Sequence, residues 1–264
     1  MSNSSTVTEG TIKSEINNGI GTITFFHPQS NSLPGSLLRK LAAEITSLGK
    51  NDNAKVIVIR SEREKAFCAG ASFDELIQID TLEKGMEFFS GFAMVINAMR
   101  LAPKFVIARV QGKAVGGGVG IASAADYTIA TEGASIKLSE LAVGIGPFVV
   151  GPAVERKIGT AAFAQLTIAA TEWKDAQWAK EKGLYAEVVA DINALNEAVN
   201  KLATTLSQSN PEAMMMLKEV FWKGTEHWNT LLEERAKMSG KLVLSDYTKE
   251  AIGKFKGRSN KKRI

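Results

Sequence analysis

FVIARVQGKAVGGGVGIASAADYTIAT (residues 105–131) is the stretch of sequence that decides the fold. Residues 105–110 form an apolar run of the buried-strand type, and YTIAT (127–131) has the composition of a second strand. Between them, three consecutive glycines, Gly116 to Gly118, precede a helical segment of small residues at 120–126. Glycine in a helix costs backbone entropy, so this run requires a reason, such as close packing or a ligand at the backbone. The stretch predicts strand, helix and strand in an α/β fold.

The same alternation extends outward from this stretch. Residues 11–26 predict two strands around a turn at Asn18-Gly19, a dipeptide that favours a tight hairpin. The core continues with a helix beginning near Pro34, a buried strand at 55–60 and a helix at 81–99. After Asp191 we find helical periodicity, at 192–208, 211–222, 226–240 and 247–257. We therefore expect an α/β core over residues 1–190, with its first ten or so residues flexible, and a helical region over 191–264 for oligomerisation and active-site closure.

Composition narrows the class of protein. The chain has 264 residues, of which 45% are hydrophobic and 23% charged, as in ordinary globular proteins. No apolar run reaches the ~20 residues that a membrane helix needs, and MSNSSTVTEG lacks the features of a signal peptide. The single cysteine, Cys68, excludes an internal disulfide and fits a reducing compartment. We expect a cytoplasmic protein without a membrane partner.

The charged and metal-binding residues exclude several kinds of chemistry. Two histidines, His27 and His227, and one cysteine are too few for a typical zinc site or for a triad with a histidine base. The net charge is +4, and no nucleic-acid motif accompanies it. Much of the excess lies at the C-terminal end, where we expect a solvated tail or contacts with ligand phosphates: Lys254, Lys256, Arg258, Lys261, Lys262 and Arg263. We expect neither a metal nor a nucleic-acid partner.

Three segments have the features of a catalytic site. KAFCAGASFDEL (65–76) contains a small-residue loop, and the triple glycine precedes a helix whose first amides lack partners. Neither matches a dinucleotide fingerprint or a P-loop. In the third segment, Glu140 is the only charged residue between Leu138 and Pro152, and an apolar setting raises a carboxyl pKa toward neutrality. Each segment alone also fits a structural role, in a tight loop, helix packing or a salt bridge. Together they supply amides for an oxyanion and one base, the requirements of enolate chemistry.

In this order, AFCAGASFDEL, VQGKAVGGGVGIASAADYTIAT and LSELAVGIGP resemble the crotonase superfamily, which is the enoyl-CoA hydratase/isomerase family. TIKSEINNGIGTITFFHPQSNSL and SDYTKEAIGKF extend the resemblance over residues 11–257. It implies a spiral of repeated β-β-α units with a C-terminal helical trimerisation region, and homotrimers that often pair into hexamers. It also implies an acyl-CoA thioester substrate, so that coenzyme A is part of the substrate and no separate cofactor is needed.

The resemblance also assigns roles to residues. The amides of Ala71 and Gly117 would bind the thioester oxygen, and Glu140 would transfer protons. The basic tail would then lie within reach of the coenzyme A phosphates. Substrate contacts are implied for two loops and for the neighbours of the catalytic residues: Gln29, Asn31, Ala66, Ala69, Gly70, Ser72, Phe73, Gly116, Gly120 and Ser139.

The sequence departs from the family's hydratases at two single positions, and also after Gly146-Pro147, where it lacks the glycine-rich stretch common in hydratases. Their second glutamate follows the triple glycine, where this chain has Gly120, and Ser72 replaces the acid that usually follows A-G-A. We expect Gly120 to leave extra volume beside the reacting carbons. Because one carboxyl suffices to move a double bond, Δ3–Δ2 isomerisation of an enoyl-CoA is the first hypothesis. A hydratase with altered water positioning, acting on enoyl or methylglutaconyl thioesters, is the second. A decarboxylase, a thioester hydrolase and a non-catalytic acyl-CoA-binding protein remain open.

Overall fold

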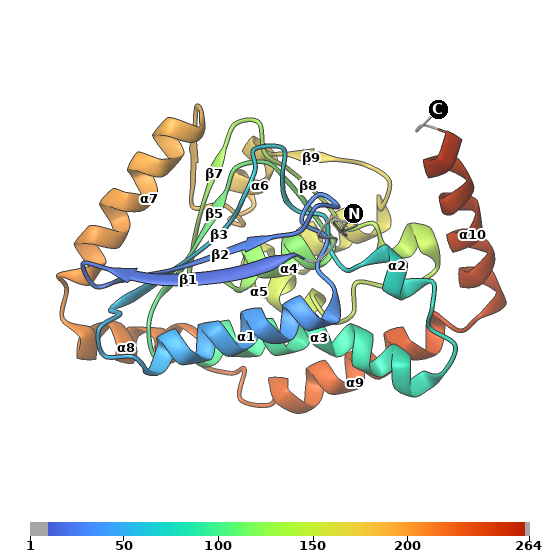
Figure 1. Ribbon diagram of the computed structural model, residues 1–264, viewed down its shortest axis with the longest axis horizontal. Helices are drawn as coiled ribbons and strands as arrows, with labels where there is room; N and C mark the ends of the chain where they lie inside the picture. Colours follow the sequence, from blue (N-terminus) through green and yellow to red (C-terminus); the bar gives the residue numbers. More distant parts are fainter. Residues whose placement is uncertain (1–9, 262–264) are drawn as a thin grey trace, which may run out of the picture.

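Two β-sheets with helices packed around them make up the computed structural model (Figure 1). The structure describes residues 10–261, with side chains in the last helix as far as Lys254. The expected flexibility of the N-terminus and the basic side chains after Lys254 lie outside the described residues. None of the described helices is long and apolar enough to cross a membrane. The predicted α/β class is confirmed.

The larger sheet has six strands in the order β1-β2-β3-β5-β7-β10. Only β1 and β2 pair in antiparallel fashion; the other neighbours are parallel. Asn18 and Gly19 both have positive φ angles, 51° and 79°, as a tight hairpin turn requires, and the predicted hairpin is confirmed. The strand bounds are Thr11–Asn17 (β1), Ile20–Phe26 (β2), Val56–Ser61 (β3), Val106–Val110 (β5), Tyr127–Thr131 (β7) and Glu187–Val189 (β10).

A second sheet of four short strands was not predicted from the sequence. Its order is β4-β6-β8-β9, with β4, β6 and β8 mutually parallel. The bounds are Ala66–Cys68 (β4), Lys113–Val115 (β6), Ser135–Lys137 (β8) and Lys174–Asp175 (β9). Strands of two or three residues are too short to show an alternating pattern, which is why periodicity misses them.

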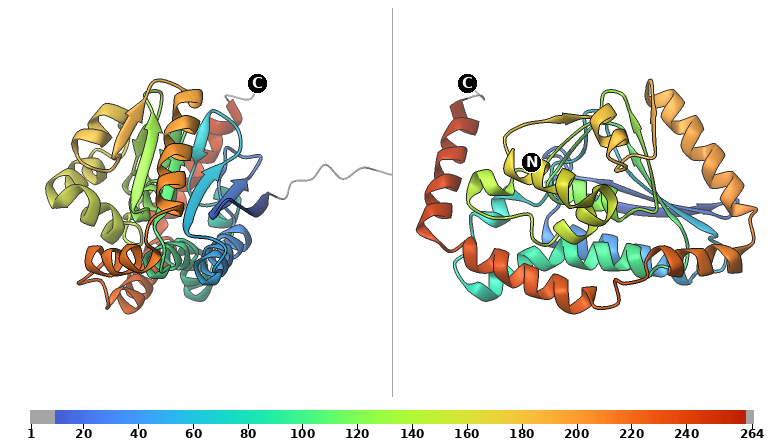
Figure 2. Two further views of the ribbon diagram at one scale, coloured as in Figure 1. Left: turned by 90° about the vertical axis from the view of Figure 1, so that its left-hand side faces the viewer. Right: turned by 180° about the vertical axis from the view of Figure 1, so that it is seen from behind.

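One layer of helices lies beneath the sheets and consists of α1 (Gly35–Lys50), α3 (Leu82–Leu101) and α9 (Trp228–Leu242) (Figures 1 and 2). Their apolar side chains form the main core with the inner face of the larger sheet, which includes Ile57 and Ile59. The opposite face of that sheet is covered by α7 (Ile192–Ser207), whose Leu195 and Val199 pack on Val56, Val58 and Ile107.

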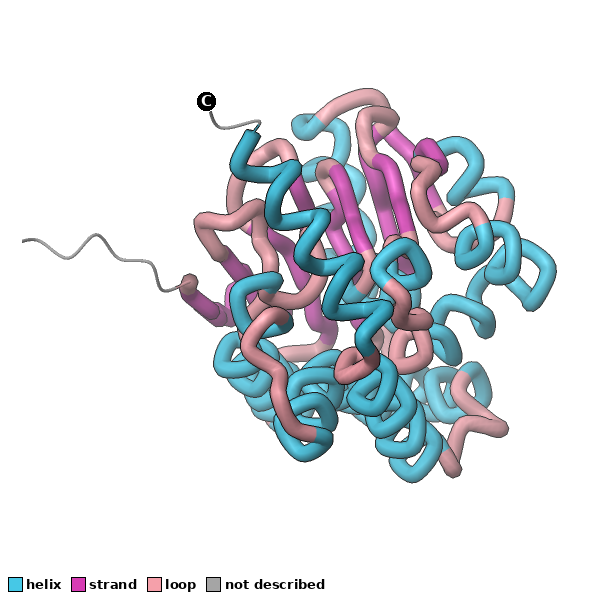
Figure 3. The backbone as a smooth tube through the Cα atoms, turned by 90° about the vertical axis from the view of Figure 1, so that its right-hand side faces the viewer, coloured by secondary structure: helices cyan, strands magenta, loops and turns pink. Residues whose placement is uncertain are grey.

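The other helices are shorter or lie at the ends of the molecule. They are α2 (Phe73–Leu76), α4 (Gly117–Ala124), the 3₁₀ helix η1 (Glu140–Val143), α5 (Gly151–Ile168), α6 (Ala176–Glu181), α8 (Pro211–Phe221) and α10 (Asp246–Lys261). The four helices expected after Asp191 are present as α7 to α10, each within a few residues of its predicted bounds. Because α7 and α9 pack directly on the core, this region is continuous with it. At the end of the molecule away from α7, α10 runs along the outside (Figures 1 and 3).

Candidate active site

The three candidate catalytic segments begin at one edge of the smaller sheet. Strand β4 leads into Ala69-Gly70-Ala71, β6 into Gly116-Gly117 and β8 into Glu140. Because β4, β6 and β8 are adjacent and parallel, their carboxyl ends meet at the same edge. Ligands of α/β proteins bind outside such carboxyl ends. The short strands that periodicity missed therefore bring the three segments together.

The loop after β4 approaches the triple glycine closely. Gly70 has a φ of +91°, and a Cβ at this position would lie 3.0 Å from the Val115 oxygen and 3.6 Å from the Gly117 nitrogen. Leu33 donates its N–H to the Gly70 carbonyl (2.8 Å) and accepts from the Ser72 N–H (3.2 Å). In this parallel bridge the N–H of the intervening Ala71 points away from Leu33. Within residues 10–261, no protein acceptor is recorded for it.

Gly116 caps α4 in a conformation that requires glycine, and Gly117 is the first residue of the helix. Gly116 has φ 52° and ψ −114° and donates its N–H to the Lys137 carbonyl (2.9 Å). The Gly117 N–H belongs to the first turn, where the helix supplies no partner, and none is recorded among the described residues. Packing also requires these glycines, since a Cβ at Gly117 would overlap the Phe92 ring and one at Gly118 the Cys68 carbonyl. The tight packing expected of the glycine run is therefore present, and the Gly117 amide without a recorded acceptor is compatible with the predicted ligand contact, which stays a prediction.

Glu140 is the first residue of η1 and lies against the triple glycine. A Cβ on Gly116 would be 2.8 Å from its Oε1. Its Oε2 is buried without a hydrogen-bond partner among the described residues. Burial raises the pKa of Glu140 to about 7, while a backbone hydrogen bond within its own residue acts in the opposite direction. The uncharged sequence around Glu140 predicted a raised pKa for its carboxyl group, and burial in the structure raises it in that direction. Such a group exchanges a proton readily near neutral pH.

The expectation of extra volume at Gly120 is wrong. A Cβ there would lie 2.5 Å from Val150 Cγ1 and 2.9 Å from Val150 Cβ. Ile96 Cδ1 is also near, at 3.7 Å. The space that a missing side chain would have left is filled by an apolar residue from just before α5, which the sequence around Gly120 does not reveal. A carboxyl group at position 120 would have to displace Val150.

The loops expected to line the coenzyme A path are joined to each other. Ala69 donates its N–H to the Ser30 carbonyl (3.2 Å). Asn31 is buried, with a φ of 56°; its Oδ1 accepts from the His27 N–H and its Nδ2 donates to the Glu62 and Ala66 carbonyls, each at 2.9 Å. The Asn31 side chain therefore shapes the loop. The Gln29 side chain is exposed and donates from Nε2 to Asp74 Oδ2 (2.8 Å).

Ser72, Phe73 and Ser139 have local structural roles. Ser72 is the N-cap of α2, where its Oγ accepts from the Glu75 N–H (3.3 Å). Phe73 begins α2 and packs on the apolar cluster of Ile145, Val243 and Ile252. The Ser139 carbonyl accepts from the Ala142 N–H (3.1 Å), which closes the first turn of η1. These residues position the segments that contain Ala71 and Glu140.

Sequence reasoning missed the contact between η1 and α10. Thr248 is fully buried, and its Oγ1 donates to the Gly144 carbonyl at the end of η1 (3.1 Å). Gly144 has a φ of +82°, and a Cβ there would be 2.6 Å from Thr248 Oγ1. The two residues are 104 positions apart, so no local pattern connects them. The one local signal in the sequence was Gly144 itself, because a glycine often ends a helix in the left-handed conformation.

Two other kinds of chemistry find no support here. Cys68 is buried beside the loop, and burial raises the pKa of its thiol to about 12, which keeps the nucleophilic thiolate rare. Among the described residues, no three His, Cys, Asp or Glu side chains gather as ligands for a metal ion. Glu140 is therefore the candidate for chemistry; it lies against Gly116, and the Gly117 and Ala71 amides belong to this loop and the one that touches it at Gly70.

Comparisons with known proteins identify relatives over most of the chain. Residues 15–262 match the family model described as enoyl-CoA hydratase/isomerase. The chain is 33% identical over 214 residues to a Bacillus subtilis protein named as an enoyl-CoA hydratase/isomerase, with 80% of each chain covered. It is also 33% identical over 200 residues to the mitochondrial methylglutaconyl-CoA hydratase of Rattus norvegicus, covering 74% of this chain and 63% of the relative. The crystal structure of an enoyl-CoA hydratase from Bacillus halodurans superposes with a TM-score of 0.85 at 22% identity, covering 92% of this chain and 98% of the other.

Proposed function

Because the chain belongs to the enoyl-CoA hydratase/isomerase family, we propose that it moves the double bond of an acyl-CoA thioester from C3 to C2, with Glu140 as the single proton carrier. The observation behind this proposal is the lone carboxyl of Glu140, buried beside Gly116 with a pKa of about 7. The enolate intermediate of such a reaction needs both a base and stabilisation of its oxygen.

The proposed oxyanion site consists of the Ala71 and Gly117 amides. Each N–H lacks a protein acceptor within residues 10–261, and the loops that contain them are in contact at Gly70. The thioester oxygen would accept both hydrogen bonds, which strengthen as negative charge develops on it. The Gly117 N–H also lies in the first turn of α4, where the helix dipole favours negative charge.

Proton transfer in this scheme requires one carboxyl group only. The Glu140 carboxylate removes a proton from C2 of the 3-enoyl thioester, which leaves a dienolate whose oxygen is held by the two amides. The same group, now a carboxylic acid, returns a proton to C4, and the double bond then lies between C2 and C3. The base is regenerated, and no water or cofactor enters the balance.

The surroundings of Gly120 support isomerisation over hydration. Hydration by the family's usual arrangement places a second glutamate at this position to hold the attacking water. Here Val150 occupies the space that the side chain of a residue at position 120 would need, so a carboxyl group has no room there unless Val150 moves. No other charged side chain contributes to the pKa shift of Glu140. The loss of one acid–base group typically lowers a rate ~10²–10⁴-fold.

Hydration of a 2-enoyl or methylglutaconyl thioester is the second candidate, because several relatives are named as hydratases. In that case another group would have to hold the water, or Glu140 would both activate the water and protonate C2.

The proposal of a homotrimer or a dimer of trimers also follows from the family. It is supported by apolar side chains that α8 exposes at Met216, Val220 and Phe221.

Product analysis separates the two candidates. The purified chain is incubated with a 3-enoyl-CoA and, separately, with a 2-enoyl-CoA, and the products are identified by chromatography and mass spectrometry. Isomerisation converts the first substrate to the 2-enoyl product without a gain in mass. A gain of one water on the 2-enoyl substrate, at a rate exceeding that of isomerisation, would establish the hydratase and overturn our first choice.

A further inference from the structure

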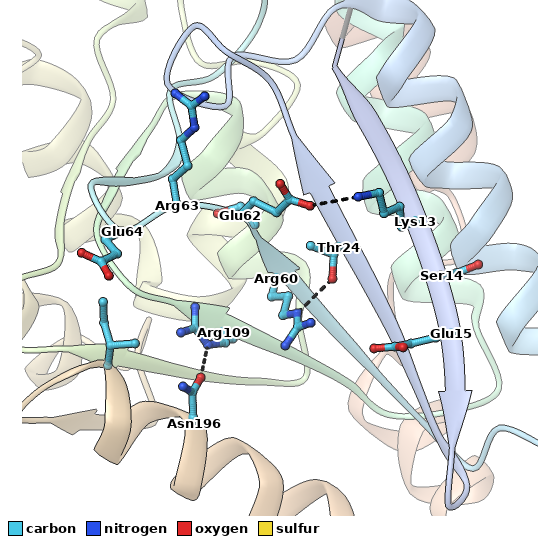
Figure 4. Close-up of a pocket in the computed structure, with 12 residues that line it drawn as sticks. Lys13, Ser14, Glu15, Thr24, Arg60, Glu62, Arg63, Glu64, Arg109 and Asn196 are labelled. Carbon is cyan, nitrogen blue, oxygen red and sulfur yellow. Dashed lines mark hydrogen bonds and ion pairs between the residues drawn. The ribbon is translucent and has the colours of Figure 1, made fainter.

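A pocket lies on the opposite face of the larger sheet from the main core, beside the first turn of α7 (Figure 4). Its volume is about 660 Å³. The walls come from β1, β2, β3, β5, the loop after β3 and α7, and they share no residue with the candidate active site. The family reaction proposed above assigns no role to this pocket.

Two arginines on neighbouring strands define the floor of the pocket. Arg60 of β3 and Arg109 of β5 are direct partners in the parallel register. Side chains alternate between the two faces of a strand, so Arg60 continues the row of Val58 and Arg109 that of Ile107, on the face covered by α7. Like charges directly opposite each other on one face of a sheet are destabilising. Arg109 is only 9% exposed, which adds the penalty of removing a cation from water.

The protein partners of these arginines are neutral. Arg109 Nε donates to Asn196 Oδ1 (2.8 Å) and its Nη1 to Gln111 Oε1 (3.3 Å). Arg60 Nε donates to Thr24 Oγ1 (2.9 Å). Within the part of the chain that is described, no ion pair is recorded for either guanidinium. Burial, followed by the charge of Arg60, lowers the pKa of Arg109.

The other charged groups of the pocket do not neutralise the pair. Glu62 accepts from Lys13 (3.5 Å), and the Arg63 guanidinium lies over the Phe26 ring, 4.6 Å from its centroid. Glu15 and Glu64 lie on the walls, on β1 and on the loop after β3 (Figure 4). Neither carboxylate comes within 4.0 Å of an arginine nitrogen in the described structure, so two positive charges face the pocket without a direct counter-ion.

We propose that this pocket binds the phosphate group of a small molecule between Arg60 and Arg109. Guanidinium groups present parallel N–H donors that match two oxygens of a phosphate, and such charge-assisted bonds are stronger than neutral ones. Both guanidinium groups are held in place beforehand, Arg109 from two sides and Arg60 by Thr24, which lowers the entropic penalty of binding. A bound dianion removes the cross-strand repulsion.

The test measures binding of inorganic phosphate to the full chain by calorimetry, with chloride at equal ionic strength as the reference. Arg60→Gln removes the more exposed arginine and leaves the Arg109 contacts intact. Arg109→Gln removes the buried one. Arg39→Gln is the matched control, because it makes the same charge change on α1, outside the pocket. We expect phosphate to bind roughly tenfold or more weakly to each pocket variant and unchanged to the control.

Coenzyme A is titrated in a second arm, to distinguish a free phosphate from the phosphates of the proposed substrate. If the pocket variants bind only inorganic phosphate more weakly, the pocket is an anion site independent of coenzyme A. If they bind both ligands more weakly to the same extent, the pocket holds a phosphate at the nucleotide end of coenzyme A. Either result supports the proposal. Equal phosphate affinity in the wild type, Arg60→Gln and the control overturns it. A change of oligomeric mass in Arg60→Gln, without an effect on phosphate, would also overturn it, since a carboxylate of a second chain would then be the counter-ion. Neither outcome depends on isomerase activity.

Discussion

The Glu140 carboxyl lies so close to Gly116 that a Cβ on residue 116 would be 2.8 Å from Oε1. Gly116 thereby serves two purposes. Its φ of 52° turns the chain into α4, and its missing side chain leaves room for the carboxyl beside the Gly117 amide. The proposed base and one proposed oxyanion donor are thus fixed relative to each other by adjacent glycines.

Replacement of Glu140 by glutamine removes the proposed proton carrier and keeps its shape. We expect the isomerisation rate to fall ~10²–10⁴-fold, since that is the usual contribution of one acid–base group. Exchange of the C2 proton with deuterated solvent, followed by mass spectrometry, should disappear with it. Glu212→Gln on the exposed start of α8 is the matched control and should keep full activity. Exchange that persists in Glu140→Gln would assign the base to another group.

The pH dependence of activity follows from the raised pKa of Glu140. The carboxylate is the reactive form, so kcat/KM should rise with pH and level off above about 7. A rate profile that is flat between pH 5.5 and 8 would contradict this assignment.

The same pKa predicts the pH dependence of stability. The folded-state pKa lies above the ordinary glutamate value of 4.5, so the folded protein binds more protons than the unfolded chain between those two pH values. Stability contributed by this group should therefore decrease as pH rises from about 4.5 through about 7, by about 3 kcal/mol in total. Urea unfolding across this range measures the change, and Glu140→Gln should remove that part of it.

The parts of this site that could be predicted from sequence are those with a local cause. The Asn18-Gly19 turn follows from local conformational preference, and the lone Glu140 from the absence of charge around it. The convergence of the three segments depends on strands of two or three residues, whose pairing is set by the fold as a whole. The contact of Val150 with Gly120 could not be predicted, because the spacing of residues along the sequence does not reveal which distant segments pack together. The same is true of Thr248 at Gly144.

Introduction of the hydratase carboxyl at position 120 should fail in the presence of Val150. Gly120→Glu places a Cβ 2.5 Å from Val150 Cγ1 and a charge in an apolar interior, so we expect a loss of roughly 3 kcal/mol or more in the free energy of unfolding. Gly120→Glu with Val150→Ala should recover part of this loss and gain measurable hydration of a 2-enoyl-CoA. Val150→Ala alone is the control. A single Gly120→Glu variant as stable as the wild type would contradict the packing described here.

Thr248 should affect catalysis through the position of η1. Thr248→Val keeps the volume and removes the hydrogen bond to the Gly144 carbonyl, leaving a buried acceptor unpaired at about 1–3 kcal/mol. If this bond positions Glu140, kcat should fall several-fold while KM changes little. Thr205→Val is the control, since its hydroxyl donates to the Lys201 carbonyl on the solvent-exposed side of α7. Equal kinetic constants for Thr248→Val and the wild type would limit Thr248 to a structural role.

A buried ion pair should make α8 essential to the stability of the core. Lys218 Nζ, almost fully buried, donates to Asp126 Oδ2 (2.9 Å) and to the carbonyls of Met99 (2.7 Å) and Lys104 (2.8 Å). Lys218→Met leaves the Asp126 carboxylate without its cation, and the loss of one partner of a buried pair typically costs ~3–5 kcal/mol. Lys254→Met, which breaks the exposed pair with Glu250, should leave the urea midpoint nearly unchanged, because solvent screens such surface pairs. Urea denaturation of both variants measures the difference. Equal midpoints would show that the two neutral donors, Trp222 Nε1 to Asp126 Oδ1 (2.8 Å) and the Val106 N–H to Asp126 Oδ2 (2.7 Å), suffice to hold the carboxylate.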